Sequence, residues 1–371
     1  MASRFLAEAA MPRNMLGFSF SAAAGPLPDE VAVDVAAACR PGRGSILSLP
    51  FTSPAFRALQ AETEACLRRL LAIPDRFRVL FLAGGASAQF ALLPLNLLGD
   101  SRPASYVDSG HWSRRAIAEA KRYAEVSIAA RVSGAVPDAA VWQVDPRAAY
   151  CHVTSNETAD GLQFREFPAL PVPLVADMTS DLLMRPLDFT RLSLVYAGAQ
   201  KTIGTPGLTL VIVDERLLGR ARPETPRVMD YAAQAAAGSR LCTPPVFPIF
   251  VAHRMLHWIE ARGGVAAMAE AACRRSEAVY AALADGAGTY AMPVDRVHRS
   301  HVNPCFRLAD EAQTALFLQA AEAGGLHDLR GHPDVGGVRV SLYNGVADAA
   351  VDALVAFLRA FARRRSGLRA A

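Results

Sequence analysis

Lysine is rare in this chain, and one of its two lysines stands where a reactive amine is expected. Lys121 and Lys201 are the only lysines among the 371 residues. Lys201 follows the apolar segment 192–197 and stands in a turn of small residues, Gly198-Ala-Gln-Lys-Thr-Ile-Gly204. Such a turn buries an amine, and burial lowers the pKa of a lysine, so that its neutral form can attack a carbonyl carbon. We expect Lys121, in the predicted helix 113–123, to be a solvated charge.

Two other segments carry groups that would complement such a lysine. Asp177 ends the apolar segment 173–177, where an open α/β sheet places ligand-binding groups, although a helix-capping role fits this position equally well. Gly84-Gly85-Ala86-Ser87 precedes a helical segment, and the N–H groups at a helix start suit a phosphate, although a plain tight turn is equally consistent. Pyridoxal phosphate requires a lysine for its aldehyde, a carboxylate for its pyridinium nitrogen and an N–H-rich turn for its phosphate.

Apolar segments and helical periodicity alternate along the first two thirds of the chain. Short apolar runs predict strands, and apolar residues that recur every three or four positions predict helices. Because the strand segments are apolar throughout, we expect a largely parallel sheet that is buried on both faces. The predicted strands are 78–82, 104–107, 149–153, 173–177, 192–197 and 208–213, and the predicted helices are 63–72, 90–98 and 113–123.

The remainder of the chain predicts a second, smaller unit. A helix over about 248–262 ends at Gly263-Gly264, a pair typical of a helix C-terminus. After it we predict helices over 266–283, 311–323 and 346–363, and strands over 303–308 and 338–343. The predicted division is an N-terminal segment (1–17), a large domain (18–260) and a small C-terminal domain (261–371).

Composition excludes several classes of protein. Hydrophobic residues make up 52% of the chain and charged residues 20%, which excludes a disordered or coiled-coil protein. The net charge of +4 is too small to provide a basic field for nucleic acid. No segment approaches the roughly 18 apolar residues of a membrane span, and the first residues lack the apolar stretch of a signal peptide.

The cysteines and histidines give no sign of a metal or a disulfide framework. The six cysteines are widely spaced and include no C-x-x-C pair, which predicts reduced thiols in a cytoplasmic protein. His253 and His257 share one face of a helix, but no third ligand accompanies them in the sequence. We expect them to be packing or surface residues, and we predict no metal site.

Eight segments together carry a resemblance to a known family. They are Phe81-Leu-Ala-Gly-Gly-Ala-Ser-Ala-Gln-Phe90, Tyr106-Val-Asp-Ser-Gly-His-Trp-Ser113, Ser155-Asn-Glu-Thr158, Ala176-Asp-Met-Thr-Ser180, Tyr196-Ala-Gly-Ala-Gln-Lys-Thr-Ile-Gly204, Thr243-Pro-Pro-Val-Phe247, Gly263-Gly-Val-Ala-Ala267 and Gly331-His-Pro-Asp-Val-Gly-Gly-Val-Arg-Val-Ser-Leu-Tyr-Asn344. With these segments, the chain resembles the phosphoserine aminotransferase family, a class V branch of the fold-type I pyridoxal phosphate enzymes, in order from about residue 18 to residue 361. The resemblance implies a large domain with a mainly parallel seven-stranded sheet sandwiched by helices, a smaller α/β C-terminal domain, and a homodimer with active sites at the interface.

The resemblance also implies roles for individual residues. Lys201 would hold the cofactor's aldehyde as a Schiff base and carry a proton between the substrate Cα and the cofactor. Asp177 would pair with the pyridinium nitrogen, and Trp112 would stack on the ring. Contacts to the phosphate or the ring hydroxyl are implied for Ala86, Ser87, Thr158, Gln200 and, from the second subunit, Cys242 and Thr243. The family has asparagine at the position of Cys242, so the contact that this residue would make with the phosphate is altered.

The side-chain end of the substrate site departs from the family. Its members bind the substrate phosphate with two His-Arg pairs, and the corresponding residues here are Phe51, Thr52, His332 and Pro333. Only His332 is retained, whereas Arg339, which binds the α-carboxylate in the family, is present. Arginine supplies the charge-assisted bonds that a partly buried phosphate requires, so its loss predicts a changed substrate.

We therefore predict a ping-pong aminotransferase that acts on an α-amino acid and a 2-oxo acid, with a substrate side chain that is not phosphorylated. One alternative is a genuine phosphoserine transaminase in which Arg43, Arg299 or Arg330 rebuilds the phosphate site. Another is a catalytically silent scaffold or binding protein, which the presence of the lysine, aspartate and tryptophan disfavours.

Overall fold

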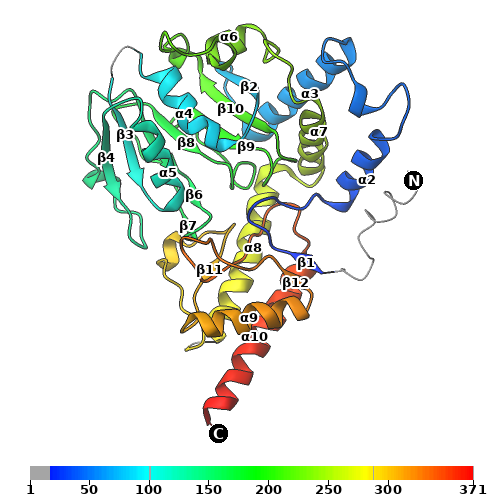
Figure 1. The fold of residues 1–371 in the computed structure, drawn as a ribbon, viewed down its shortest axis with the longest axis vertical. Helices are drawn as coiled ribbons and strands as arrows, with labels where there is room; N and C mark the ends of the chain where they lie inside the picture. The colour runs from blue at the N-terminus through cyan, green and yellow to red at the C-terminus, as the bar shows by residue number, and fades with distance from the viewer. Residues whose placement is uncertain (1–16, 100–101, 287, 371) are drawn as a thin grey trace, which may run out of the picture.

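The computed structural model describes residues 17–99, 102–286 and 288–370 (Figure 1). The predicted N-terminal segment (1–17), apart from Gly17, lies outside these residues. The chain forms an α/β structure around a seven-stranded sheet with the spatial order β2-β10-β9-β8-β5-β3-β4. The strands are β2 (Phe77–Ala83), β3 (Ala104–Asp108), β4 (Val126–Arg131), β5 (Cys151–Thr154), β8 (Leu174–Asp177), β9 (Leu194–Gly198) and β10 (Leu208–Asp214).

The sheet is mainly parallel, as the sequence predicted. β9, β8, β5, β3 and β4 pair in parallel, whereas β10 pairs antiparallel with both β9 and β2. Every strand except β10 therefore ends at the same edge of the sheet. The predicted fold class is confirmed. Of these seven strands the sequence analysis missed β4, an edge strand whose side chains are mostly half-buried.

Helices cover both faces of the sheet, with a separate apolar core on each side (Figure 1). On one face, α3 (Pro54–Leu71) and α7 (Val246–Ala261) pack against each other and against the sheet. The opposite face is covered by α4 (Ala86–Leu97), α5 (His111–Ala120) and α6 (Tyr231–Ala236). The N-terminal helix α2 (Asp29–Ala38) contacts α7.

Two helices begin well before their predicted first residues. α3 begins at Pro54 rather than near residue 63, because Ser53 caps it by accepting a hydrogen bond from the Phe56 N–H at 3.2 Å and proline is favoured in the first helical turn. α4 begins at Ala86 rather than residue 90, because its first turn consists of small and polar residues that add nothing to the apolar periodicity.

The C-terminal part has its own apolar core but little sheet. Its helices are α8 (Gly264–Asp285), α9 (Glu311–Ala323) and α10 (Asp348–Ala370), close to the predicted positions. The predicted strands 303–308 and 338–343 are shorter than expected, since only β11 (Cys305–Phe306) and β13 (Val338–Arg339) pair there. Within the described residues, no helix is long and apolar enough to cross a membrane.

The start of the described chain packs with this C-terminal part. β1 (Phe18–Ser19) pairs in parallel with β12 (Leu326–His327), and Phe20 is buried in the C-terminal core. The chain then passes along the sheet edge, where the Gly25 N–H donates to the Gln200 carbonyl at 2.8 Å. Residues 18–20 therefore pack with the predicted small domain rather than with the large one to which they were assigned. The division near residue 260 stays a prediction.

Candidate active site

A cavity of about 360 Å³ lies at the carboxyl ends of the parallel strands. Open α/β sheets bind their ligands at this edge, because loops from several strands converge there. Lys201 follows β9, Asp177 ends β8, and Trp112 lies in the first turn of α5, just after β3. The cavity lining includes nine residues that the sequence predicted, namely Ala86, Ser87, Trp112, Thr158, Asp177, Gln200, Lys201, His332 and Arg339.

Lys201 reaches into this cavity beside an aromatic ring. Its Nζ lies 5.6 Å from the centre of the Trp112 ring. Burial lowers the pKa of Lys201 to about 8; the carboxylate of Asp177 opposes this shift, and the guanidinium of Arg339 adds to it. The amine is therefore uncharged in a much larger fraction of molecules near neutral pH than an exposed lysine would be. Lys121 is exposed at the end of α5, as predicted.

Asp177 is a buried carboxylate at the floor of the cavity, with 6% of its surface exposed. Its Oδ1 accepts a hydrogen bond from the Thr179 N–H at 2.9 Å. Burial raises the pKa of Asp177, whereas the bonds from Thr179 and the charge of Lys201 lower it. Burial of a charged carboxylate costs free energy, and a cationic partner in the cavity, such as a protonated ring nitrogen, would offset that cost.

The start of α4 is open to an anion. Gly84 has φ +123°, a conformation that favours glycine, and it turns the chain from β2 into the helix. Within the described part of the chain, no side chain caps this helix N-terminus. At Gly198 a Cβ would lie 2.6 Å from the Gln200 Oε1 and 3.4 Å from the Ala86 nitrogen, so glycine keeps this space free.

Trp112 and Arg339 are both held by Thr158, which follows β6 (Asn156–Glu157). The indole Nε1 of Trp112 donates to the Thr158 Oγ1 at 2.8 Å. The Nη1 of Arg339 donates to the Thr158 carbonyl at 3.2 Å, whereas its buried Nε has no partner among the described residues. A fixed guanidinium with an unfilled donor suits a carboxylate ligand.

These groups fit pyridoxal phosphate. Lys201 supplies an amine of lowered pKa for its aldehyde, and Asp177 supplies a buried carboxylate for its ring nitrogen. The uncapped N-terminus of α4 supplies N–H donors for its phosphate.

Comparisons with known proteins agree with this chemistry. The model of the family "Aminotransferase class-V" matches residues 18–354. The chain belongs to the class V aminotransferases. Phosphoserine aminotransferase of Acidithiobacillus ferrooxidans is 44% identical over 359 residues, which cover 95% of this chain and 99% of that protein.

Solved structures place the chain in the same family. Phosphoserine aminotransferase from Bacillus circulans subsp. alkalophilus is 38% identical, with a TM-score of 0.90 over 93% of this chain and 98% of that one. The pyridoxal phosphate-bound enzyme from Trichomonas vaginalis is 33% identical, with a TM-score of 0.88 over 92% and 99% of the two chains. This class V aminotransferase is therefore a transaminase that depends on pyridoxal phosphate, and the scaffold alternative is excluded.

In the lining of the cavity, His332 has two neighbours that the sequence analysis did not identify as site residues. The rings of His332 and His111 lie with their centroids 4.0 Å apart. One oxygen of Asp334 lies 3.5 Å from the His111 Nδ1 and 3.8 Å from the His332 Nδ1. Burial lowers the pKa of His332, as do the nearby His111 and Arg339, which favours the neutral ring.

None of the three arginines considered as replacements for the family's phosphate ligands lines the cavity. Arg330 lies 3.9 Å from Glu311, and its side chain is 68% exposed. Arg299 donates to the Val294 carbonyl at 2.9 Å and lies over the Tyr280 ring. Arg43 lies on an exposed loop.

Four predicted site residues lie outside the cavity of the single chain. Phe51 and Thr52 precede α3, and Cys242 and Thr243 precede α7. Thr52, Cys242 and Thr243 are exposed, and Phe51 is half-buried. The two segments lead into α3 and α7, which pack against each other on the same face of the sheet (Figure 1).

Several lining residues were not predicted. Ala22 and Ala23 come from the segment after β1, Thr154 is the last residue of β5, and Asn156 is the first residue of β6. The run of small residues before Gly25-Pro26 was a usable signal for the first pair, since it predicts close backbone approach. The second pair falls inside or beside a family segment but has no side chain with distinctive chemistry.

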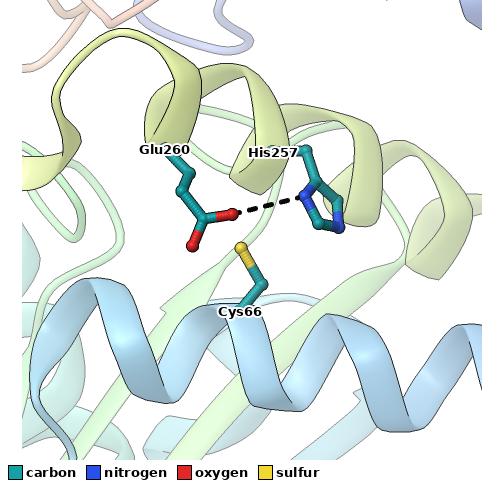
Figure 2. Close-up of side chains that lie close together, drawn as sticks. All are labelled: Cys66, His257 and Glu260. Atoms are coloured by element: carbon teal, nitrogen blue, oxygen red, sulfur yellow. Dashed lines mark ion pairs between the residues drawn. The ribbon is translucent and has the colours of Figure 1, made fainter.

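A cluster of potential metal ligands lies between α3 and α7, and none of its residues lines the cavity. Figure 2 shows Cys66 of α3 pointing toward His257 and Glu260 of α7, a proximity that the sequence did not indicate. Glu260 accepts a hydrogen bond from the Arg69 Nε at 2.9 Å, and its Oε2 lies 3.5 Å from the His257 Nδ1. Burial raises the pKa of Cys66 to about 11, so the thiol stays protonated. The carboxylate is thus already paired, and the cluster joins the helices by hydrogen bonds and ion pairs.

Proposed function

We propose that this aminotransferase acts on an α-amino acid whose side chain carries no phosphate and is neutral or modestly polar. The observation that supports it is the charge at the substrate end of the cavity. Among the lining residues the basic side chains are Lys201, Arg339 and His332, and His332 stands beside the carboxylate of Asp334. The position that holds an arginine in the family is occupied by Pro333.

The physical reason lies in desolvation. A phosphate that leaves water loses hydration energy, which cationic hydrogen-bond donors in the site must replace. Without such a donor, the free energy of the bound phosphate rises by several kcal/mol, on the order of the penalty for an unpaired buried ion. A neutral imidazole beside a carboxylate offers little of this energy to a dianion, and the carboxylate repels it. The same ring offers a hydrogen bond to a hydroxyl, amide or similar group.

The roles of the other residues follow from their positions. Arg339 binds the substrate's α-carboxylate through the donors that its contact with Thr158 leaves unfilled. The N–H groups of Ala86 and Ser87, together with Gln200, bind the cofactor phosphate, Trp112 stacks on the cofactor ring, and Thr158 bonds the ring hydroxyl. These assignments rest on the cavity lining and on the resemblance of the segments that carry them.

Pyridoxal phosphate, when bound, supplies an electron sink for the negative charge that develops at the substrate Cα. Asp177 holds a proton on the cofactor's ring nitrogen, because its buried negative charge favours a cation beside it. Lys201 takes the proton from Cα and returns it later in the cycle, a task that suits an amine with a pKa of about 8.

The proposal includes a homodimer in which each subunit completes the other's site. Phe51, Thr52, Cys242 and Thr243 resemble family positions that contact the cofactor or the substrate, yet they lie outside the cavity of their own chain. Supply from a neighbouring subunit reconciles these two facts. A cytoplasmic location is part of the same proposal and rests on the scattered cysteines.

A second candidate is phosphoserine transamination itself. The curated relatives named phosphoserine aminotransferase are 41–45% identical to this chain, which favours it. The two candidates differ in the side-chain end of the site, where this chain lacks the family's arginines.

A substrate panel tests the proposal. The purified enzyme with its cofactor is mixed, one at a time, with amino acids that differ in side-chain charge, and loss of the lysine-bound cofactor's visible absorbance is followed. We expect neutral or modestly polar amino acids to discharge the absorbance fastest. Discharge by phosphoserine alone would support the second candidate.

A further inference from the structure

A buried carboxylate lies directly behind the cavity, at the N-terminus of the helix that carries Trp112. Glu157 has no exposed surface. Its Oε2 accepts from the Trp112 N–H at 2.9 Å, and its Oε1 accepts from the Ser113 N–H at 2.9 Å and from the Ser109 hydroxyl at 3.1 Å. Both carboxylate oxygens therefore accept hydrogen bonds from the first turn of α5 or from the residues just before it.

The local chain is shaped to admit this carboxylate. A Cβ at Gly110 would lie 2.8 Å from the Glu157 Cδ, so any larger residue would push the helix end away. Burial and the charge of Asp160 raise the pKa of Glu157 to about 7, whereas the N–H groups of Trp112 and Ser113 at this helix start favour the charged form and oppose that shift. Asp160 accepts a hydrogen bond from the preceding N–H of the same turn, since its Oδ2 lies 2.9 Å from the His111 nitrogen.

The residue after Glu157 holds the other end of the same tryptophan. Thr158 accepts from the Trp112 indole Nε1, whereas Glu157 accepts from the Trp112 backbone N–H. Two consecutive residues thus fix both the helix end and the ring plane, and this ring lies 5.6 Å from the Lys201 Nζ. Glu157 itself does not line the cavity.

We propose that Glu157 is a positioning residue, whose buried carboxylate fixes the backbone of Trp112 and thereby the orientation of the indole over the cofactor. The inference rests on the proposed stacking role of Trp112. It assigns Glu157 no contact with the cofactor or the substrate.

The test is a double-mutant cycle between Glu157 and Trp112, measured as the dissociation constant of pyridoxal phosphate from the apoenzyme. The measurement is made above pH 8, where Glu157 is ionised. We expect Glu157→Gln to weaken binding about tenfold in the parent chain but less than about twofold in the Trp112→Ala chain, because the effects of two coupled substitutions on binding free energy are not additive. Visible circular dichroism of the bound cofactor falls in Glu157→Gln as well. Asp160→Asn is the matched control, since it changes the same helix end but bonds His111, and its dissociation constant stays within about twofold of the parent.

The outcomes separate the inference from the proposed function. An equal loss of affinity from Glu157→Gln in both backgrounds, or no loss in the parent, overturns the positioning role. An unchanged dissociation constant in Trp112→Ala overturns the stacking role of the tryptophan, and the inference falls with it. If Glu157→Gln does not fold, Glu157→Asp replaces it in the cycle, because the shorter side chain keeps the charge but withdraws it from the Trp112 N–H.

Discussion

His332, which lines the cavity, places its Nδ1 3.8 Å from the carboxylate of Asp334. Burial and two neighbouring basic groups lower the pKa of this histidine, so the ring is mainly neutral at physiological pH. The residue pair therefore offers hydrogen bonds and a negative charge where a phosphate needs positive charge. This relationship underlies the proposed substrate preference.

The first prediction concerns the two lysines. Lys201→Ala removes the amine in the cavity and abolishes both covalent attachment of the cofactor and turnover, whereas Lys121→Ala, at an exposed helix end, leaves both nearly unchanged. Borohydride reduction followed by mass measurement of the intact chain detects the attached cofactor. Cofactor bound covalently to the Lys201→Ala chain would contradict the assignment.

The second prediction concerns Asp177. Asp177→Asn keeps the hydrogen bond from the Thr179 N–H but removes the charge, so the chain folds as before and turnover falls by about 100-fold or more. Single-turnover rates and thermal unfolding of the variant measure the two effects separately. Turnover equal to that of the parent would show that the carboxylate is only structural.

The third prediction is a pH dependence of cofactor capture by the apoenzyme. The pKa of Lys201 is about 8 rather than its ordinary 10.5, and only the neutral amine attacks the aldehyde. The capture rate therefore rises as pH increases toward about 8 and then levels off. In Asp177→Asn the inflection moves to lower pH, because the carboxylate that stabilises the ammonium is gone. A rate that keeps rising to pH 10.5 would show an ordinary lysine.

The fourth prediction concerns the second subunit. If Thr243 serves its partner's site, a mixture of Lys201→Ala and Thr243→Val chains forms heterodimers in which one site has both native residues. Activity of the refolded or co-expressed mixture then exceeds that of either variant alone. Equal, low activity in the mixture would place Thr243 and Lys201 in the same chain's site, or Thr243 in none.

The sequence predicted the chemistry of the site better than its surroundings. Lys201 and Asp177 could be found because each lies at the carboxyl end of an apolar strand, and the parallel pairing of β8 with β9 brings these ends to one edge of the sheet. Glu157 was part of a recognised segment, but its role depends on a helix end that begins more than 40 residues earlier in the chain. Sequence spacing carries no signal for such a contact.

The same limit applies to the substrate end and to the short strands. His111 and Asp334 approach each other only after the C-terminal part has folded against the sheet edge. β11 and β13 contain just two residues each, although the apolar runs around them are longer, because tertiary packing rather than strand propensity buries those runs.

The most direct test of the proposed substrate class is the ratio of kcat/KM for phosphoserine to that for unphosphorylated amino acids of similar length, measured with one 2-oxo acid acceptor. The charge arrangement of His332, Asp334 and Arg339 predicts that the best unphosphorylated substrate has the higher value. A hundredfold preference for phosphoserine, which corresponds to about 2.7 kcal/mol of transition-state stabilisation, would contradict the proposal and show that other residues bind the phosphate.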